Sequence, residues 1–234
     1  IIGGGLAGCE AAWQAAMRGV KVGLFEMRPA RLTEAHKTGL LGELVCSNSL
    51  RSADPLTAPG LLKQELQMAD SLIMKAAETS RIPAGSALAV YRTAFSGFIT
   101  DALSGNPLIN VVTEEVREIS DTVSIIATGP LTSSPMAETL QRLLGNENLS
   151  FYDAIAPIVD GESIDYTRVY FASRYGKGGD DYLNCPMTRE EYESFFSQLK
   201  EADRVHARDF EHEKVFEGCM PVEVMAVRGK DTLR

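Results

Sequence analysis

The sequence predicts an α/β protein, and three features near its beginning support that prediction. Two isoleucines open the chain and are typical of the end of a buried strand. Four glycines follow over residues 3–8, and apolar residues then recur at helical spacing from 6 to 17. A short apolar strand over 21–25 comes after Gly19, which is placed to end the helix. Strand, glycine turn, helix and strand together indicate a β-α-β unit.

The rest of the chain predicts further elements in order. Residues 27–59 lack a periodic pattern and predict a long functional loop. Hydrophobic spacing predicts helices over 61–77 and 93–103, and strands over 109–113, 115–119 and 123–127. Beyond about residue 150, apolar and aromatic residues alternate between turn residues, which predicts β-structure. A helix over 188–199 begins with a capping box, in which Thr188 precedes Glu191 by three residues.

This change of character predicts two domains. Residues 1–150 would form a Rossmann-like domain, and residues 151–234 a smaller mixed α+β insertion domain. The first strand has only two residues before the glycines, and the last residues carry no terminating signal. We therefore expect the chain to be incomplete at both ends.

Composition narrows the class of protein. The 234 residues are 44% hydrophobic and 24% charged, as in a soluble globular protein, and no apolar run reaches the length of a membrane span. The net charge of −9 gives no electrostatic support for generic nucleic-acid binding. Four widely spaced cysteines without a CxxC pair argue against a disulfide scaffold or a zinc site, and the three histidines lack metal-ligand spacing. We expect no metal and a reducing, cytoplasmic location.

The glycine turn has the spacing of a dinucleotide-binding site. In Gly3-x-Gly5-x-x-Gly8, the first glycine permits a tight turn, the second lets the backbone approach a pyrophosphate, and the third lets helix and strand pack closely. The helix that follows would direct its unpaired N–H groups at the phosphates. The residues expected to contact the cofactor here are Gly3, Gly4, Gly5, Leu6, Ala7 and Gly8.

Two further segments refine the identity of the dinucleotide. Glu26 ends the second strand, where its carboxylate can accept hydrogen bonds from ribose hydroxyls and disfavours a 2′-phosphate. The segment 124–129, ending in Thr128-Gly129, is similar to the ATG motif of flavoproteins with two dinucleotide-binding domains, in which a later strand returns beside the first. Together these features favour FAD over NAD.

Two cysteines lie in polar surroundings and suggest chemistry. Cys46 is followed by Ser47, Asn48 and Ser49, a setting that can favour a thiolate, and Cys219 follows a glycine in an expected turn. With a flavin, the pair fits either a thiol–disulfide reductase or an enzyme that uses a covalent cysteine nucleophile. The first reading typically requires closely spaced cysteines.

Six segments taken together resemble one enzyme family. They are GGGLAGCEAAWQAAMRGVKVGLFEMRP, ELVCSNSLRS, IPAGSALAVYR, IIATGPLTS, YLNCPMT and FEGCMPVEVMAVRG. From end to end the sequence is similar to the TrmFO family, the bacterial folate- and FAD-dependent tRNA (uracil-5-)-methyltransferases. It is more distantly similar to the GidA/MnmG flavoproteins that modify the tRNA wobble uridine. The two cysteine motifs favour the first family.

The resemblance implies a complete chemistry. A thiolate adds to C6 of the T-loop uridine of tRNA, and C5 then attacks a one-carbon unit from 5,10-methylenetetrahydrofolate. FADH⁻ supplies the reducing hydride, and NAD(P)H recharges the flavin. By the same resemblance Cys219 is the nucleophile and Cys46 its partner near the flavin, while Arg28 assists at the adenosine end.

Other functions stay open at this point. They are wobble-uridine modification, another FAD-dependent oxidoreductase activity, and a nucleotide-binding partner protein without catalysis. Arg168, Arg174 and Lys177 are candidates for contact with tRNA phosphates, although a surface role is equally compatible. The sequence leaves the oligomeric state open.

Overall fold

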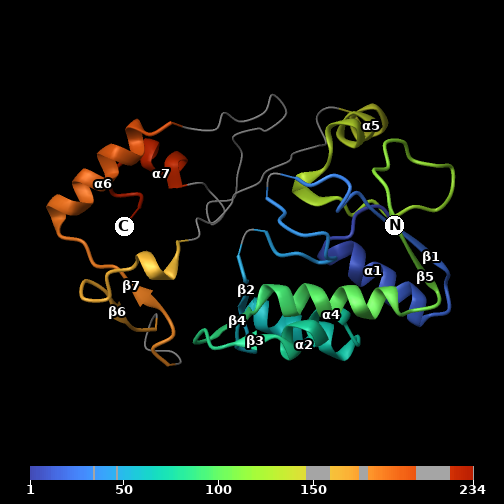
Figure 1. Ribbon diagram of the computed structural model, residues 1–234, viewed down its shortest axis with the longest axis horizontal. Helices are drawn as coiled ribbons and strands as arrows, with labels where there is room; N and C mark the ends of the chain where they lie inside the picture. Colours follow the sequence, from blue (N-terminus) through green and yellow to red (C-terminus); the bar gives the residue numbers. More distant parts are fainter. Residues whose placement is uncertain (34, 46, 146–158, 174–178, 204–221, 234) are drawn as a thin grey trace.

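The computed structural model describes residues 1–33, 35–45, 47–145, 159–173, 179–203 and 222–233 (Figure 1). A small parallel sheet lies in the N-terminal part, and helices pack against it. This mixed α/β arrangement agrees with the fold class expected from the sequence. Among the helices of the described residues, none is both long enough and apolar enough to span a lipid bilayer.

The strand order of this sheet follows the Rossmann pattern. Strand β1 (Val22–Glu26) pairs in parallel with β5 (Ile109–Thr113), with Val22 opposite Ile109. On the other side of β1, Ile2 forms parallel bridges to Phe25 and to Ile126. The order across the sheet is therefore third, second, first and fourth in chain order, as in a doubly wound dinucleotide fold. The carboxyl ends of the first and fourth segments meet at the point where the order reverses.

Helices cover both faces because successive strand residues point in opposite directions. Helices α1 (Leu6–Met17), α3 (Leu72–Thr79) and α4 (Arg92–Ser104) contribute to the larger core, against which Ile1 packs. Ile2 faces the other way and packs with Met136 and Leu140 of α5 (Ser134–Leu144). The first strand therefore lies between two hydrophobic clusters.

The helix predicted over 61–77 is two helices. Helix α2 (Ala58–Met68) ends before Asp70, whose φ of 59° leaves the helical region, and α3 begins after Ser71. Side chains of α1 stabilise the break: Trp13 Nε1 donates to the Asp70 carbonyl at 3.2 Å, and Ser71 Oγ donates to Glu10 at 2.8 Å. The hydrophobic spacing continues through the break, so the prediction of one helix was wrong.

Two predicted strands are also corrected. Residues 115–119 form no strand, because Val116 and Ile119 pack into the smaller core from an irregular backbone. Of the segment 123–127, only Ile126 forms a β-bridge, and Val123 is fully exposed. The predictions over 93–103 and 109–113 are confirmed, the first within one residue at each end.

The region expected to be one long loop contains a strand of a second sheet. Strands β2 (Ser49–Ser52), β3 (Arg81–Ile82) and β4 (Ala87–Val90) form an antiparallel sheet in the order β2-β4-β3. A short 3-10 turn, η1 (Gly129–Leu131), follows the fourth segment of the parallel sheet.

The elements after residue 158 are fewer and smaller. They are η3 (Gly161–Ser163), the antiparallel pair β6 (Tyr170–Phe171) and β7 (Leu183–Asn184), α6 (Arg189–Glu201) and α7 (Val222–Arg228). The capping box of α6 is confirmed, with Thr188 and Glu191 bonded reciprocally. Tyr182 Oη donates to the Ala84 carbonyl at 3.0 Å, which joins this part to the β3–β4 turn. The predicted boundary between 150 and 151 lies outside the described residues.

Candidate functional site

The glycine turn after the first strand combines tight packing with one open position. Gly3 has a φ of +105°, and a Cβ there would lie 2.5 Å from the Ala127 carbonyl oxygen. A Cβ on Gly8 would lie 1.9 Å from the Gly3 carbonyl oxygen. A Cβ on Gly5, in contrast, would meet nothing within 4 Å. Packing therefore requires glycine at positions 3 and 8, whereas Gly5 leaves its side of the turn open to a ligand.

The first turn of α1 offers backbone donors beside this opening. Gly5 is the N-cap and makes no side-chain cap hydrogen bond, and the first turn carries no acidic residue. The first N–H groups of a helix have no partner within the helix, and its dipole places partial positive charge there. Leu6 and Ala7, which begin the helix, present these groups. The arrangement is suited to an anionic group such as a pyrophosphate.

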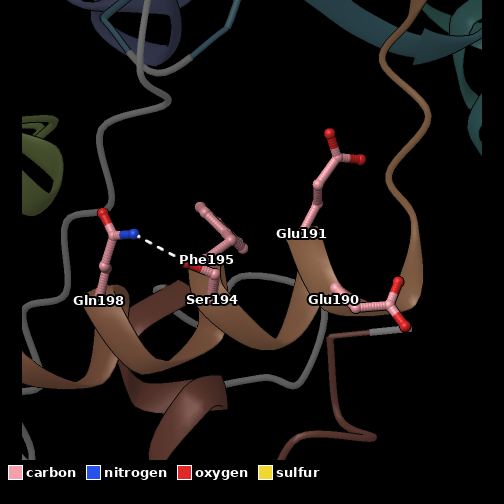
Figure 2. Close-up of a pocket in the computed structure, with 5 residues that line it drawn as sticks. All are labelled: Glu190, Glu191, Ser194, Phe195 and Gln198. Atoms are coloured by element: carbon pink, nitrogen blue, oxygen red, sulfur yellow. Dashed lines mark hydrogen bonds between the residues drawn. The ribbon is translucent and has the colours of Figure 1, made fainter.

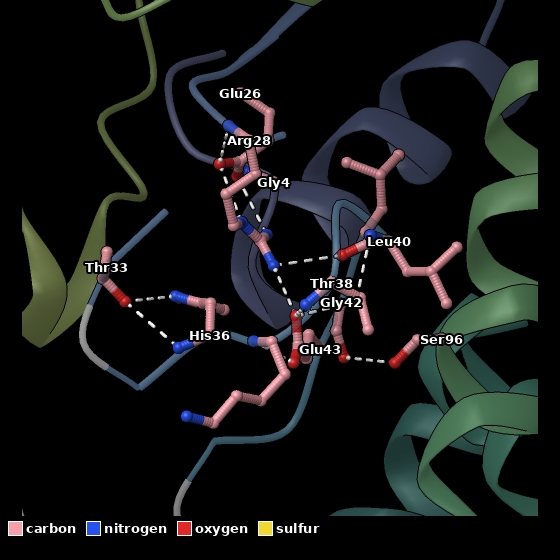
Figure 3. Close-up of polar contacts among 12 residues, drawn as sticks. Gly4, Glu26, Arg28, Thr33, His36, Thr38, Leu40, Gly42, Glu43 and Ser96 are labelled. Atoms are coloured by element: carbon pink, nitrogen blue, oxygen red, sulfur yellow. Dashed lines mark hydrogen bonds and ion pairs between the residues drawn. The ribbon is translucent and has the colours of Figure 1, made fainter. Parts of the chain in front are cut away.

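The carboxylate of Glu26 is buried and fully engaged (Figure 3). Its Oε2 accepts from Gly4 N at 2.8 Å and from Arg28 Nη2 at 3.1 Å. Its Oε1 accepts from Arg28 N at 3.0 Å and from Arg28 Nε at 2.9 Å. A carboxylate has about four lone-pair positions, and here four donors use them. Any further donor must share Glu26 with Arg28.

Burial alone would raise the pKa of Glu26, because a charged carboxylate is costly away from water. The hydrogen bonds and charge of Arg28, with the N–H of Gly4, outweigh this effect and hold the pKa below its ordinary value. Glu26 is therefore ionised at neutral pH.

Arg28 joins Glu26 to a second carboxylate on the following loop. Its Nη1 lies 3.2 Å from Glu43 Oε2 and donates to the Leu40 carbonyl at 3.1 Å. Glu43 also accepts from Lys37 N at 2.9 Å, from Thr38 N at 3.1 Å and from Thr38 Oγ1 at 2.8 Å. Figure 3 shows these contacts as one continuous network. We call the residues Glu26, Arg28 and Glu43 the buried ion network.

The segment 40–43 contacts both the glycine turn and helix α4. Gly42 N donates to the Gly4 carbonyl at 2.8 Å, and Ser96 Oγ of α4 donates to the Gly42 carbonyl at 3.5 Å. Leu41 N donates to Thr100 Oγ1 at 2.9 Å. Sequence reasoning missed Glu43, since one glutamate in an irregular segment has no distinguishing spacing. Its burial arises only when the loop folds back onto Arg28.

Thr128 and Gly129 lie beside the glycine turn, at the reversal point of the strand order. Ala127 N donates to the Ile2 carbonyl at 2.8 Å, which places the next residues near Gly3. Gly129 has a φ of +64°, and a Cβ there would meet nothing within 4 Å. In doubly wound sheets, ligands bind in the crevice at this reversal point. The cofactor residues expected from the sequence thus gather at one edge of the sheet.

The two cysteines predicted to be catalytic, Cys46 and Cys219, lie outside the described residues. Cys9 is completely buried on α1, with Sγ 3.2 Å from the Gly4 carbonyl oxygen. Burial, reinforced by the charge of Glu26, raises the pKa of Cys9 to about 12. Cys9 is therefore a structural thiol, as its position on the inner helix face indicates. Cys185 is exposed.

A shallow hollow of about 480 Å³ lies along α6 (Figure 2). Residues of this one helix line it, among them Glu190, Glu191 and Phe195. Gln198 Nε2 donates to Ser194 Oγ at 3.1 Å across it. Two carboxylates at one end disfavour phosphate groups there. The hollow is therefore a poor candidate for a nucleotide site.

Comparisons with known proteins identify the family of this chain. The family model described as "Glucose inhibited division protein A" matches residues 1–234. The chain is 60% identical over 234 residues to the methylenetetrahydrofolate--tRNA-(uracil-5-)-methyltransferase TrmFO of Natranaerobius thermophilus, covering all of this chain and 54% of that protein. The proteins of the same name from Moorella thermoacetica and Aquifex aeolicus are 60% and 53% identical, again over all of this chain and 54% and 53% of theirs.

The chain thus spans about half the length of the curated relatives it matches. Among solved structures, it is similar to Aquifex aeolicus GidA in the form II crystal, with a TM-score of 0.42 and 20% identity over 52% of this chain and 20% of that one. The family model matches every position of the chain, including the glycine turn and the acidic end of β1. The chain therefore belongs to the glucose inhibited division protein A family.

Proposed function

We propose that this chain is part of a folate- and FAD-dependent tRNA (uracil-5-)-methyltransferase. The observation that carries the proposal is its identity of 53–60% with proteins of that name over its whole length. The open glycine turn at the reversal point of the sheet supplies an independent reason to expect a dinucleotide. The substrates would be tRNA, 5,10-methylenetetrahydrofolate and NAD(P)H.

The residues around the glycine turn fit the pyrophosphate of FAD. Gly5 leaves room for close backbone approach, and the amides of Leu6 and Ala7 supply donors. Thr128 and Gly129 would border the cofactor from the fourth strand segment. When bound, the reduced flavin supplies the hydride that converts a one-carbon unit into a methyl group.

Glu26 would hold the adenosine ribose and must share its carboxylate to do so. Two of its four donors are backbone N–H groups, from Gly4 and Arg28, and these are fixed by the chain. The guanidinium of Arg28 is the movable partner, and it already contacts Glu43. Ribose hydroxyls would therefore compete with the guanidinium for Glu26. While the ribose is bound, Glu43 would keep Arg28 in place.

Cys219 and Cys46 would perform the covalent chemistry on uracil. A thiolate that adds to C6 gives C5 the electron density to attack an electrophilic carbon, and a proton must then leave C5 before the thiolate is expelled. We assign the addition to Cys219 and the proton transfer to Cys46. This division follows the resemblance of their sequence motifs to the TrmFO family.

Contact of this chain with tRNA would rely on local positive charge, because the chain carries a net charge of −9. Of the three cationic candidates, Arg168 lies in the described residues, and it is exposed and paired with Glu191 at 2.6 Å. RNA phosphates would compete with this exposed pair at low cost, since such pairs contribute about 0–1 kcal/mol. We place FAD binding in residues 1–150 and tRNA contact in 151–234.

The decisive experiment is methylation by the full-length protein. Unmodified tRNA transcript, methylenetetrahydrofolate and NADPH are incubated with the FAD-loaded enzyme, and the digested nucleosides are analysed by mass spectrometry. We expect 5-methyluridine that depends on folate, and its loss with FAD retained in Cys46→Ala or Cys219→Ala. A modified wobble uridine instead, or no product from a protein that contains FAD, would refute the proposal.

A further inference from the structure

A second cavity lies on the opposite side of segment 40–45 from the glycine turn. Its volume is about 280 Å³, and it is enclosed by residues 35–45 and the first turns of α4. Leu40, Leu44 and Val45 form its apolar wall. Its polar groups come from two elements, Lys37 and Thr38 on the loop and Arg92, Thr93 and Ser96 on α4. A cavity with an apolar wall and a few converging polar groups is the usual form of a small-molecule site.

The charges around this cavity do not balance. Within the part of the chain that the structure describes, Glu43 is the one acidic residue that lines the cavity, and its carboxylate already accepts from Arg28, from two backbone N–H groups and from Thr38 Oγ1. The oxygens of Glu43 are therefore occupied by these donors, although two carboxylates and one guanidinium leave the buried ion network with a net negative charge. Lys37 and Arg92 form no ion pair with any residue that the structure describes. Two cations remain to face the cavity.

The position of the cavity links it to the dinucleotide turn. Gly42 donates through its N–H to Gly4 in the turn, while its carbonyl accepts from Ser96, which lines the cavity. The backbone at Gly42 therefore lies between the cavity and the glycine turn and contacts both. The cavity also borders Leu44 and Val45, which lead directly to position 46.

We propose that this cavity binds the oxyanion end of a small co-substrate, the glutamate carboxylate of a folate or the 2′-phosphate of a nicotinamide nucleotide. The proposal rests on the function proposed above and adds a site to it. Ligand pockets usually measure about 300–1,000 Å³, so this cavity takes an anionic fragment and not a whole folate or dinucleotide. Lys37 and Arg92 bind the oxyanion, Thr38 and Thr93 offer hydroxyl donors, and the apolar wall contacts the adjoining carbon atoms.

Equilibrium binding to the FAD-loaded full-length protein tests this assignment without turnover. The ligands form two pairs that differ at their anionic end: tetrahydrofolate and the primary amide of tetrahydropteroic acid, which lacks the glutamate and carries no carboxylate, and NADP⁺ and NAD⁺, which lacks the 2′-phosphate. The variants are Arg92→Gln and Lys37→Gln. Arg142→Gln is the matched control, because Arg142 lies on α5 and its exposed guanidinium is paired with Glu118. Flavin absorbance verifies that each variant holds FAD.

We expect Arg92→Gln and Lys37→Gln each to raise the Kd of one complete ligand, tetrahydrofolate or NADP⁺, about tenfold. This factor is at the lower end for loss of a charge-assisted hydrogen bond at a partly exposed site. The Kd of its truncated counterpart should stay unchanged, because the group that the cation binds is missing. If the variants lose affinity for tetrahydrofolate alone, the cavity binds the folate carboxylate. If they lose affinity for NADP⁺ alone, it binds the 2′-phosphate.

Three results would overturn the assignment. They are Kd values within twofold of wild type for all four ligands, an equal loss for complete and truncated ligands, and an equal loss in Arg142→Gln. Formation of 5-methyluridine by the wild type is recorded separately. If wild type methylates tRNA while the variants bind normally, only the cavity assignment fails. If wild type forms no 5-methyluridine, the proposed function fails, whatever the Kd values are.

Discussion

Replacing Arg28 with methionine should destabilise the protein by about 3 kcal/mol at pH 7. The side chains of Arg28, Glu26 and Glu43 are 2%, 8% and 11% exposed, so the change leaves one buried and one partly buried carboxylate without their cation. Removing one partner of a buried ion pair costs about 3–5 kcal/mol. We expect the lower end because both carboxylates keep backbone N–H donors. Methionine retains much of the apolar stem, so the charge dominates the effect.

The loss should depend on pH with a defined sign. In wild type the pKa of Glu26 and that of Glu43 are lowered, so their contribution is present above the unfolded value of about 4.3 and lost as pH falls below it. Without Arg28, burial is no longer opposed by the guanidinium, and the pKa of Glu26 should rise above its ordinary value. A carboxyl group whose pKa is raised on folding stabilises the folded state at low pH, where it is protonated, and this contribution is lost as pH rises through the raised pKa. The difference between variant and wild type should therefore shrink from pH 7 to pH 5.

Urea unfolding of the FAD-free full-length protein, followed by circular dichroism at both pH values, measures this difference. Adding Glu43→Gln to Arg28→Met should restore about 1 kcal/mol or more, because one uncompensated charge is removed. Arg142→Met, on an exposed pair, should cost less than about 1 kcal/mol. A loss below 1 kcal/mol for Arg28→Met at pH 7, or a difference that widens at pH 5, would refute the reasoning.

Three other predictions follow from single positions. Gly8→Ala should give protein that has lost FAD, because its Cβ would lie 1.9 Å from the Gly3 carbonyl oxygen. The control is Gly97→Ala on α4, whose Cβ would meet nothing within 4 Å and which should keep FAD. Flavin absorbance per protein measures both. Ser71→Ala should cost about 1–2 kcal/mol in urea unfolding, because this buried hydroxyl caps α3; a change below a few tenths would contradict the capping role. In native protein at pH 8, iodoacetamide should label exposed Cys185 and leave Cys9 unmodified, since the pKa of Cys9 is about 12; equal labelling by peptide mass spectrometry would contradict this.

The sequence was sufficient to predict elements whose causes are local. The glycine turn, helix α1 and strand β1 follow from residues within the first 26 positions, since steric need for glycine and apolar periodicity are properties of neighbours in the chain. Strand β5 and the capping box of α6 were predicted for the same reason.

Features that arise from contacts between distant segments could not be predicted. The break between α2 and α3 has no glycine or proline within 69–71, and it is stabilised by Trp13 and Glu10, more than fifty positions earlier. The burial of Glu43 depends on Arg28 from another turn of the chain. The segment 115–119 was predicted as a strand, yet Val116 and Ile119 pack against the cluster that includes residues of α5 while their backbone stays irregular. Tertiary packing decided each of these cases.

The position of Gly42 between the glycine turn and helix α4 has a consequence for engineering. A side chain added there would meet Ile99 Cδ1 at 2.7 Å, and the φ of +66° already disfavours any residue but glycine. Because Gly4 and Ser96 hold the same residue from its two sides, a substitution that shifts one side moves the other. Mutations in the glycine turn and in the α4 cavity should therefore combine non-additively, and neither surface can be redesigned alone.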